Sequence, residues 1–209
     1  HLSSAAEALA TGADVAFSGV TFIDGSGREI PGQAEPSAEQ LADIAPSMFR
    51  YNFVQCTSTL SLRRAWIDRV GNFDVTLSHG EDLDLWLRLL AAGAVWRYTA
   101  RCSCKYRKHA TSAMGQTLLV VERMAAFYEK HLSNPLIPRA TRRGALIHNR
   151  RTQARLHWRK RPFEAAVALR RLVRLQPWNP LYLCALPGVL VWSLFSTRTT
   201  TPGKSVRAR

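Results

Sequence analysis

Two adjacent carboxylates, Glu81 and Asp82, are the residues of this sequence whose types and placement best suit acid–base chemistry. They follow Gly80, and the apolar residues after them recur at the spacing of one helix face, so a helix is predicted to begin at Glu81. Backbone N–H groups and the helix dipole favour an ionised carboxylate at such a position. An ionised carboxylate at a loop-to-helix junction can accept a proton from an incoming hydroxyl group. Acidic residues also cap helices for stability alone, so capping stays open as the second interpretation.

Other elements must position these carboxylates, and the pattern of apolar residues predicts them as alternating strands and helices. Strands are predicted over residues 13–23, 28–30, 52–62, 95–99 and 105–107. Helices are predicted over residues 2–12, 38–45, 63–70, 81–92 and 117–132. The alternation predicts an α/β domain that extends to about residue 132.

Several short motifs lie around the two carboxylates in a fixed order. Val70–Asp74 reads VGNFD, Glu81–Asp82 follows a glycine-containing loop, and Leu85–Leu89 reads LWLRL. Outside these lie a strand-and-turn pattern at 13–27, a strand ending in paired arginines at 58–64, and the sequence YRKH at 106–109. Each motif is short, but together their order and spacing resemble family 2 glycosyltransferases of the GT-A fold. The resemblance covers roughly residues 1–115.

The resemblance implies the C-terminal, acceptor-side half of a Rossmann-like nucleotide-diphospho-sugar transferase domain, followed by an α-helical extension. Asp82 would be the general base that deprotonates the acceptor hydroxyl, and Glu81 would orient the acceptor or support the loop. The deprotonated oxygen would then attack the anomeric carbon of a nucleotide-sugar donor, with inversion. By the same resemblance the enzyme would need Mn²⁺ or Mg²⁺, take a glycan or lipid-linked acceptor, and serve the synthesis of cell-surface polysaccharide or other glycans.

Four further residues are candidates for the site, each with a structural alternative. His109 matches a histidine with which related enzymes help to bind the metal or the diphosphate; the alternative is a surface histidine in a basic turn. Arg107 and Lys108 would make chemical sense as a charge clamp on a diphosphate, but the same side chains could be solvated. Trp86 could line the acceptor site, or it could pack in the core within the apolar stripe of its helix.

The donor-binding parts of such an enzyme are expected outside these 209 residues. The resembling enzymes carry a DXD-type metal motif in a nucleotide-binding first half, and Asp82-Leu83-Asp84 has the letters of that motif without its context. The QxxRW element of processive synthases does not occur in the sequence. Because the sequence begins abruptly at His1, inside a predicted helix, we expect a fragment that is inactive on its own.

Charge divides the chain into a balanced first part and a strongly basic second part. Residues 1–138 carry 13 Lys or Arg against 14 Asp or Glu, whereas residues 139–209 carry 16 against one. Arg-rich helices are predicted over 139–175, and an apolar stretch interrupted by proline and glycine follows at 179–195. That stretch is short for a membrane span of about 20 residues and suits an interfacial segment better.

Three regions are therefore expected. They are an acceptor-side transferase domain over 1–132, a basic helical extension with the apolar segment over 133–195, and a disordered tail over 196–209. The extension has three interpretations: helices packed on the domain with a solvated Arg face, a contact with an anionic membrane surface, or nucleic-acid binding. No helix-turn-helix, RNA-recognition or zinc pattern supports nucleic-acid binding, so a nucleic acid is the least expected partner.

Four cysteines stand at spacings that fit no zinc-binding pattern: Cys56, Cys102, Cys104 and Cys184. We expect them to be thiols of a cytoplasmic protein, peripheral at the inner face of the membrane if the basic extension binds lipid. Two functions besides the enzyme fragment stay open. One is a binding module that kept the fold without catalysis, and the other is a membrane-docking or nucleic-acid-binding accessory protein.

Overall fold

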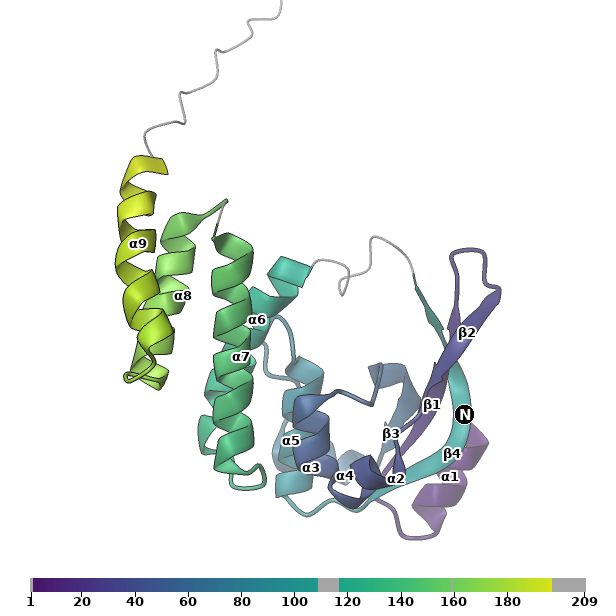
Figure 1. Ribbon diagram of the computed structural model, residues 1–209. Helices are drawn as coiled ribbons and strands as arrows, with labels where there is room; N and C mark the ends of the chain where they lie inside the picture. Colours follow the sequence, from purple (N-terminus) through teal and green to yellow (C-terminus); the bar gives the residue numbers. More distant parts are fainter. Residues whose placement is uncertain (1, 109–116, 159, 197–209) are drawn as a thin grey trace, which may run out of the picture. The chain divides into compact units, whose positions relative to one another are not determined.

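A computed structural model describes residues 2–108, 117–158 and 160–196 of the chain (Figure 1). The chain divides into two compact units, His1–Ala145 and Leu146–Arg209. The boundary lies inside helix α7 (Arg139–His157), later than the boundary after residue 132 that the sequence suggests. It lies there because residues beyond 132 still belong to the first core, in which Ile137 is buried. The segment 197–209, which belongs to the expected disordered tail, lies outside the described residues.

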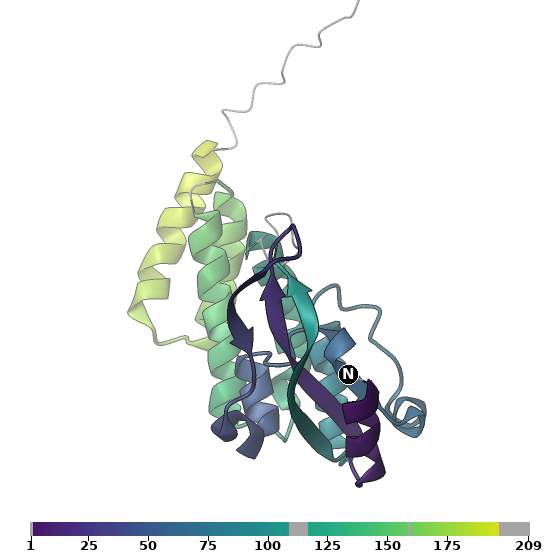
Figure 2. The same cartoon turned by 90° about the vertical axis from the view of Figure 1, so that its right-hand side faces the viewer.

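The first unit is an α/β unit built on a small mixed sheet of four strands, with β1 (Val15–Ile23) at its centre. Strand β4 (Trp96–Arg107) runs parallel to β1 along the length of β1 (Figures 1 and 2). On the other edge, β2 (Glu29–Ala34) pairs with the second half of β1 and β3 (Leu60–Leu62) with the first half, both antiparallel. Strand β1 is buried over most of its length, which explains its nearly continuous apolar sequence.

Helices surround this sheet and connect its strands. Their bounds are α1 (Leu2–Ala10), α2 (Ala38–Ala42), α3 (Ile44–Arg50), α4 (Arg64–Val70), α5 (Glu81–Ala91) and α6 (Thr117–Lys130). Two short 3-10 turns, η1 (Thr57–Thr59) and η3 (His131–Ser133), precede β3 and follow α6. The helix predicted to begin at Glu81 is confirmed, and so are the hairpin between β1 and β2 and the helix before Gly71.

Two strand predictions differ from the structure. The apolar run over 52–62 contributes only the short strand β3, because Phe53 and Val54 reach the core from an irregular segment instead of a ladder. An apolar run alone does not distinguish these two cases. The two strands predicted over 95–99 and 105–107 form the single strand β4, which stays continuous through register shifts against β1.

Helix α5 lies at the centre of the first core. The stripe predicted from the sequence is buried at Leu83, Trp86 and Leu87, but Leu85 and Leu89 on other sides of the helix are buried too. A helix that is apolar on nearly all sides is one that the protein encloses. Its surroundings include aromatic residues of β1 and β4, where the ring of Phe17 packs against those of Trp96 and Tyr98.

One polar residue of α5, Asp84, is fully buried in this apolar environment. Its carboxylate lies 2.9 Å from Arg88 Nε, 2.6 Å from Lys130 Nζ and 3.0 Å from His131 Nε2. Burial alone would raise the pKa of Asp84, but the three donors outweigh it and hold that pKa well below the ordinary value. Asp84 is therefore ionised and joins α5 to the end of α6 and to η3.

Arg88 and Lys130 extend this network to the VGNFD segment. The guanidinium of Arg88 donates to the carbonyl oxygens of Val70 at 2.6 Å and Asn72 at 2.7 Å. Lys130 also donates to a carboxylate oxygen of Asp74 at 2.7 Å. The motifs VGNFD and LWLRL are thus held together by charged hydrogen bonds, which gives their spacing a structural reason.

The second unit contains the later part of α7, helix α8 (Pro162–Leu175) and helix α9 (Pro180–Ser196). The sequence predicts that Ala166, Leu169 and Leu172 of α8 face inward and that its arginines face outward, and both predictions are confirmed. Helix α9 packs on α8 through Tyr182 and Val189. Within the ranges that the structure describes, no helix is long and apolar enough to cross a membrane.

The network around Asp84 predicts a large loss of stability when its charge is removed. Replacing Asp84 with alanine removes the buried acceptor that Arg88, Lys130 and His131 share, so the free energy of unfolding should fall by about 3–5 kcal/mol. The matched control is Asp68→Ala, which removes an exposed pair with Arg64 in α4 and should cost less than about 1 kcal/mol. Urea denaturation of both variants checks this, and equal losses would contradict the role assigned to Asp84.

Candidate functional site

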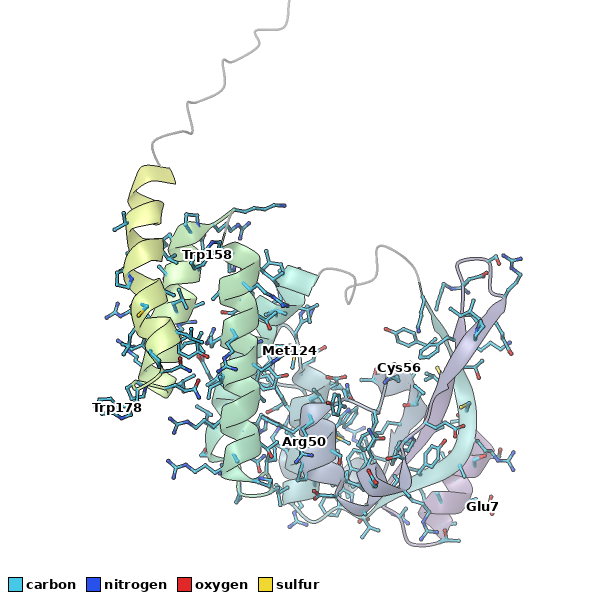
Figure 3. The ribbon with its side chains drawn as sticks, in the orientation of Figure 1. Glu7, Arg50, Cys56, Met124, Trp158 and Trp178 are labelled. Carbon is cyan, nitrogen blue, oxygen red and sulfur yellow. The ribbon has the colours of Figure 1, made fainter. Side chains whose placement is uncertain are left out.

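Glu81 and Asp82 line a pocket of about 600 Å³ in the first unit. The pocket is enclosed by side chains from four stretches of chain: Phe49, Arg50, Asn52 and Gln55 after and at the end of α3; Ser78, His79 and Gly80 before α5; Tyr106 at the end of β4; and Val120, Met124 and Tyr128 on α6. Figure 3 labels Arg50 and Met124, which belong to two of these walls. Elements far apart in the sequence therefore meet at the two carboxylates.

Asp82 is half-buried at the start of α5, and both of its carboxylate oxygens accept a hydrogen bond. One oxygen accepts from the backbone N–H of Leu83 at 2.7 Å, and the other accepts from the side-chain amide of Asn52 at 3.3 Å. The first bond satisfies a free N–H group in the first turn of α5, although the N-cap residue is Gly80, which has no side chain to cap the helix. The second bond links the helix start to a residue that the chain places thirty positions earlier.

Burial changes the pKa of Asp82 more than its position at the helix start does. Burial raises the pKa of Asp82, and the negative charge of Glu81 adds to the rise, while the hydrogen bonds from Leu83 and Asn52 oppose it. The sequence suggests that the helix start favours the ionised form; the structure shows that this effect is outweighed. A carboxylate with a raised pKa is a stronger base than an exposed aspartate once it is ionised.

Asn52 brings a second polar group to the pocket. Its Oδ1 atom is buried, and no residue in the described part of the chain donates a hydrogen bond to it. The amide orientation is fixed by Asp82, because reversing it would place two acceptor oxygens against each other. Buried acceptors are nearly always paired, so Oδ1 suits a hydroxyl donor from a ligand or a water molecule.

Trp86 lies in the core and does not line the pocket. Its side chain is 2% exposed, and its ring packs edge-on against those of Phe73 and Trp96. This placement favours the packing interpretation over contact with an acceptor, because so buried a side chain has no surface to offer a ligand.

The basic residues after Tyr106 contact the end of β1 and the β1–β2 turn, and neither is among the residues that line the pocket. The guanidinium of Arg107 donates to the carbonyl oxygens of Asp24 and Gly25, both at 3.0 Å. The ammonium group of Lys108 lies 3.4 Å from the centre of the Phe22 ring. Both side chains are exposed, so a diphosphate clamp stays a prediction. His109, the candidate metal ligand, lies outside the described residues.

The metal that the resemblance implies stays a prediction, because the resemblance places the main metal motif outside this sequence. Across the ranges covered by the structure, no group of three or more His, Cys, Asp or Glu side chains is arranged to hold a metal ion. Asp82 and Asp84 differ in their surroundings, since Asp84 is buried among its own three donors. Binding of Mn²⁺ or Mg²⁺ is therefore not assigned to any residue in this part of the chain.

Several residues of the pocket carry no local signal in the sequence. Asn52 and Gln55 stand in a segment that reads as a strand, and Tyr128 reads as part of the apolar face of a helix. Only the tertiary structure brings them to Asp82. No family model, curated protein or solved structure matches this chain. The function must therefore be inferred from the pocket and from the order of the motifs.

The pKa of Asp82 is a direct test of the environment described for it. In a carboxyl NMR titration Asp82 should titrate above the ordinary aspartate value of 3.8, whereas Asp24, whose pKa is lowered by the Ser26 hydroxyl, should titrate below it. The nearly isosteric variant Asn52→Leu removes a hydrogen bond to the ionised form, so it should raise the pKa of Asp82 further. A pKa of Asp82 below that of Asp24 would contradict the arrangement.

Gly80 directly precedes the two carboxylates in a left-handed backbone conformation, and a side chain at this position should destabilise the protein. It has φ +79°, and a Cβ atom there would lie 3.0 Å from Phe127 and 3.1 Å from Met124. Gly93, just beyond the other end of α5, has φ +89°, and no atom of the described residues lies within 4 Å of its Cβ position.

Comparing Gly80→Ala with Gly93→Ala separates backbone strain from crowding at the pocket. Gly93→Ala should lower the free energy of unfolding by about 1–2 kcal/mol through its left-handed backbone alone. Gly80→Ala should lose a further 1–3 kcal/mol, approximately, because α6 must move. Thermal or urea denaturation measures both, and equal losses would show that α6 does not pack against Gly80.

Proposed function

We propose that this chain is the acceptor side of a glycosyltransferase, in which Asp82 removes the proton from the acceptor hydroxyl group. The observation that supports this is the half-buried carboxylate of Asp82, with a raised pKa, at a pocket of about 600 Å³. A base of this kind needs access to its substrate and partial protection from water, and the pocket provides both.

The chemical step moves one proton and one glycosyl group. Asp82 takes the proton of the acceptor hydroxyl as its oxygen forms a bond to the anomeric carbon of the donor. The bond between that carbon and the donor's phosphate oxygen breaks, and the nucleoside diphosphate leaves with the electron pair. Asp82 then returns the proton to solvent. The proposal assigns no step to a metal ion, because the described residues offer no ligand set for one.

The lining of the pocket supports a hydroxyl-rich acceptor such as a saccharide. The unpaired Oδ1 of Asn52 can accept from one hydroxyl, and Glu81 beside Asp82 can accept from another. Tyr106 of β4 and Tyr128 of α6 contribute aromatic surface to the lining. Polar groups that can fix the orientation of a ligand, combined with apolar and aromatic side chains, are typical of small-molecule sites.

Other parts of the proposal are supported by the motif resemblance alone. These are the GT-A fold, the nucleotide-sugar donor, the inversion at the anomeric carbon and a role in cell-surface or other glycan synthesis. In the proposal, donor binding is supplied by residues outside these 209, so the chain alone is inactive. A cytoplasmic location belongs to the proposal as well, and the four free thiols are in keeping with it.

The test is a transfer assay with variants of the two helix-start carboxylates. The chain is produced together with any residues that precede it in its gene, and nucleoside diphosphate release from sugar nucleotides is measured with and without saccharide acceptors. Asp82→Asn should lower kcat by about 10²- to 10⁴-fold, because an amide cannot accept the proton. The fold should survive, since the Asn52 amide can turn to accept from the new amide group.

Two controls make the result specific. Asp68→Asn changes an exposed aspartate of the same unit and should leave the rate unchanged. Glu81→Gln should cost less than Asp82→Asn if Glu81 only orients the acceptor. Unchanged turnover in Asp82→Asn would refute the base assignment. Saccharide binding at the pocket without any turnover would instead support the alternative, a binding module that kept the fold without catalysis.

A further inference from the structure

Helix α9 of the second unit turns one apolar face to α8 and another to solvent. The inner face consists of Tyr182, Ala185, Leu186 and Val189, at the spacing of one helix side. The outer face includes Leu181, Leu183, Cys184, Leu190 and Val191, all exposed. No charged residue occurs anywhere between Pro180 and Ser196. The exposed side of α9 is therefore as apolar as the side that packs inward.

The connection between α8 and α9 adds the most exposed aromatic side chain of this surface. Trp178 is 91% exposed, and Leu181 at the start of α9 is 74% exposed. Figure 3 shows Trp178 at the connection, projecting away from the helices. Large exposed apolar patches are rare in water-soluble proteins and usually mark interaction sites, so we expect this face to contact an apolar partner.

The same unit is strongly basic. Residues 146–196 carry nine Lys or Arg and a single acid, Glu164. On α8 the exposed residues Phe163, Val167, Arg170 and Arg174 fall on one side of the helix, so one stripe carries apolar side chains in its first half and basic side chains in its second half.

One of these basic residues is tied to α9 itself. Arg151 donates to the hydroxyl of Tyr182 and, at 3.3 Å, to the side-chain oxygen of Gln176. Because Tyr182 belongs to the inner face of α9, this contact adds to the positive charge of the unit but not to that of the outer face.

We propose that the second unit docks on an anionic lipid bilayer, with α9 lying along the surface and its outer face among the acyl chains. This occupant is favoured because a bilayer offers apolar and negatively charged groups side by side, which matches the two properties of the unit. Trp178 then lies at the level of the headgroups, where tryptophan is preferred. The inference is independent of the proposed glycosyl transfer.

Two other occupants fit these observations less well. A second copy of the chain would cover α9 but would bring the same positive charge to the interface, which opposes association. A nucleic acid would match the arginines but would leave the outer face of α9 exposed, because that face has no side chain that hydrogen-bonds phosphate or base edges. Both occupants are outcomes that the experiment can detect.

The experiment is flotation of the full chain with two kinds of vesicle. Vesicles of phosphatidylcholine mixed equally with phosphatidylglycerol should carry the protein upward, and vesicles of phosphatidylcholine alone should carry much less. Salt at about 1 M, where the Debye length is about 3 Å, should weaken the binding. Equal binding to both vesicles, or none to either, overturns the proposal.

A matched pair of variants tests whether α9 makes the contact. Leu181→Glu places a charge on the outer face and should weaken vesicle binding by about tenfold or more. Val75→Glu makes the same kind of change at a 96% exposed residue of the first unit, and should leave binding unchanged. Circular dichroism confirms that both variants are folded, and an equal effect of the two variants overturns the assignment to α9.

Cys184 provides a reporter on the outer face of α9. A water-soluble maleimide, located by peptide mass spectrometry, should label Cys184 in the free protein and much less when anionic vesicles are present. Protection of Cys184 without lipid, together with a dimeric mass that Leu181→Glu abolishes, would show that a second copy covers the face and would overturn the proposal. Protection by added oligonucleotide instead of lipid would overturn it in favour of nucleic acid.

Discussion

Burying the ionised carboxylate of Asp84 imposes a constraint on the first unit, because a charge removed from water must receive its hydrogen bonds from protein donors. Arg88, Lys130 and His131 supply them from α5 itself, from the end of α6 and from the turn that follows. Asn134 completes the network by donating to the second ring nitrogen of His131, which leaves the first nitrogen to carry its proton toward Asp84. These bonds fix the rotation of α5 against α6, and that rotation places the first turn of α5 at the pocket.

Within three residues, the same helix holds two carboxylates whose pKa values are shifted in opposite directions. The pKa of Asp84 is lowered, because the hydrogen bonds from three donors outweigh the effect of burial. The pKa of Asp82 is raised, because the effect of burial outweighs that of its two hydrogen bonds. Environments that push neighbouring carboxyl pKa values apart are the usual means of separating a structural acid from a reactive one. Asp84, which holds the helix in place, and Asp82, which lines the pocket, are therefore close in sequence but lie in different surroundings.

The two units differ in how much of their apolar surface is exposed. In the first unit the apolar residues of β1 and α5 are enclosed, and the charges there are nearly balanced. In the second unit, apolar residues of α9 between Leu181 and Val191 are exposed, and the unit carries a large excess of arginine. A chain with one enclosed core and one exposed apolar and basic surface can combine a pocket for a small ligand with attachment to an extended anionic partner.

The sequence by itself determined the helix start at Glu81, the inward and outward residues of α8, the apolar character of α9 and the division of charge. These are local properties, since periodicity and composition are read along a few turns of chain. Only the tertiary structure decided that Asn52 holds Asp82, that Trp86 packs in the core and that Arg107 binds the β1–β2 turn. The physical reason is that the partner of a polar side chain stands tens of residues away, and the direction of a pKa shift depends on burial that no local pattern records.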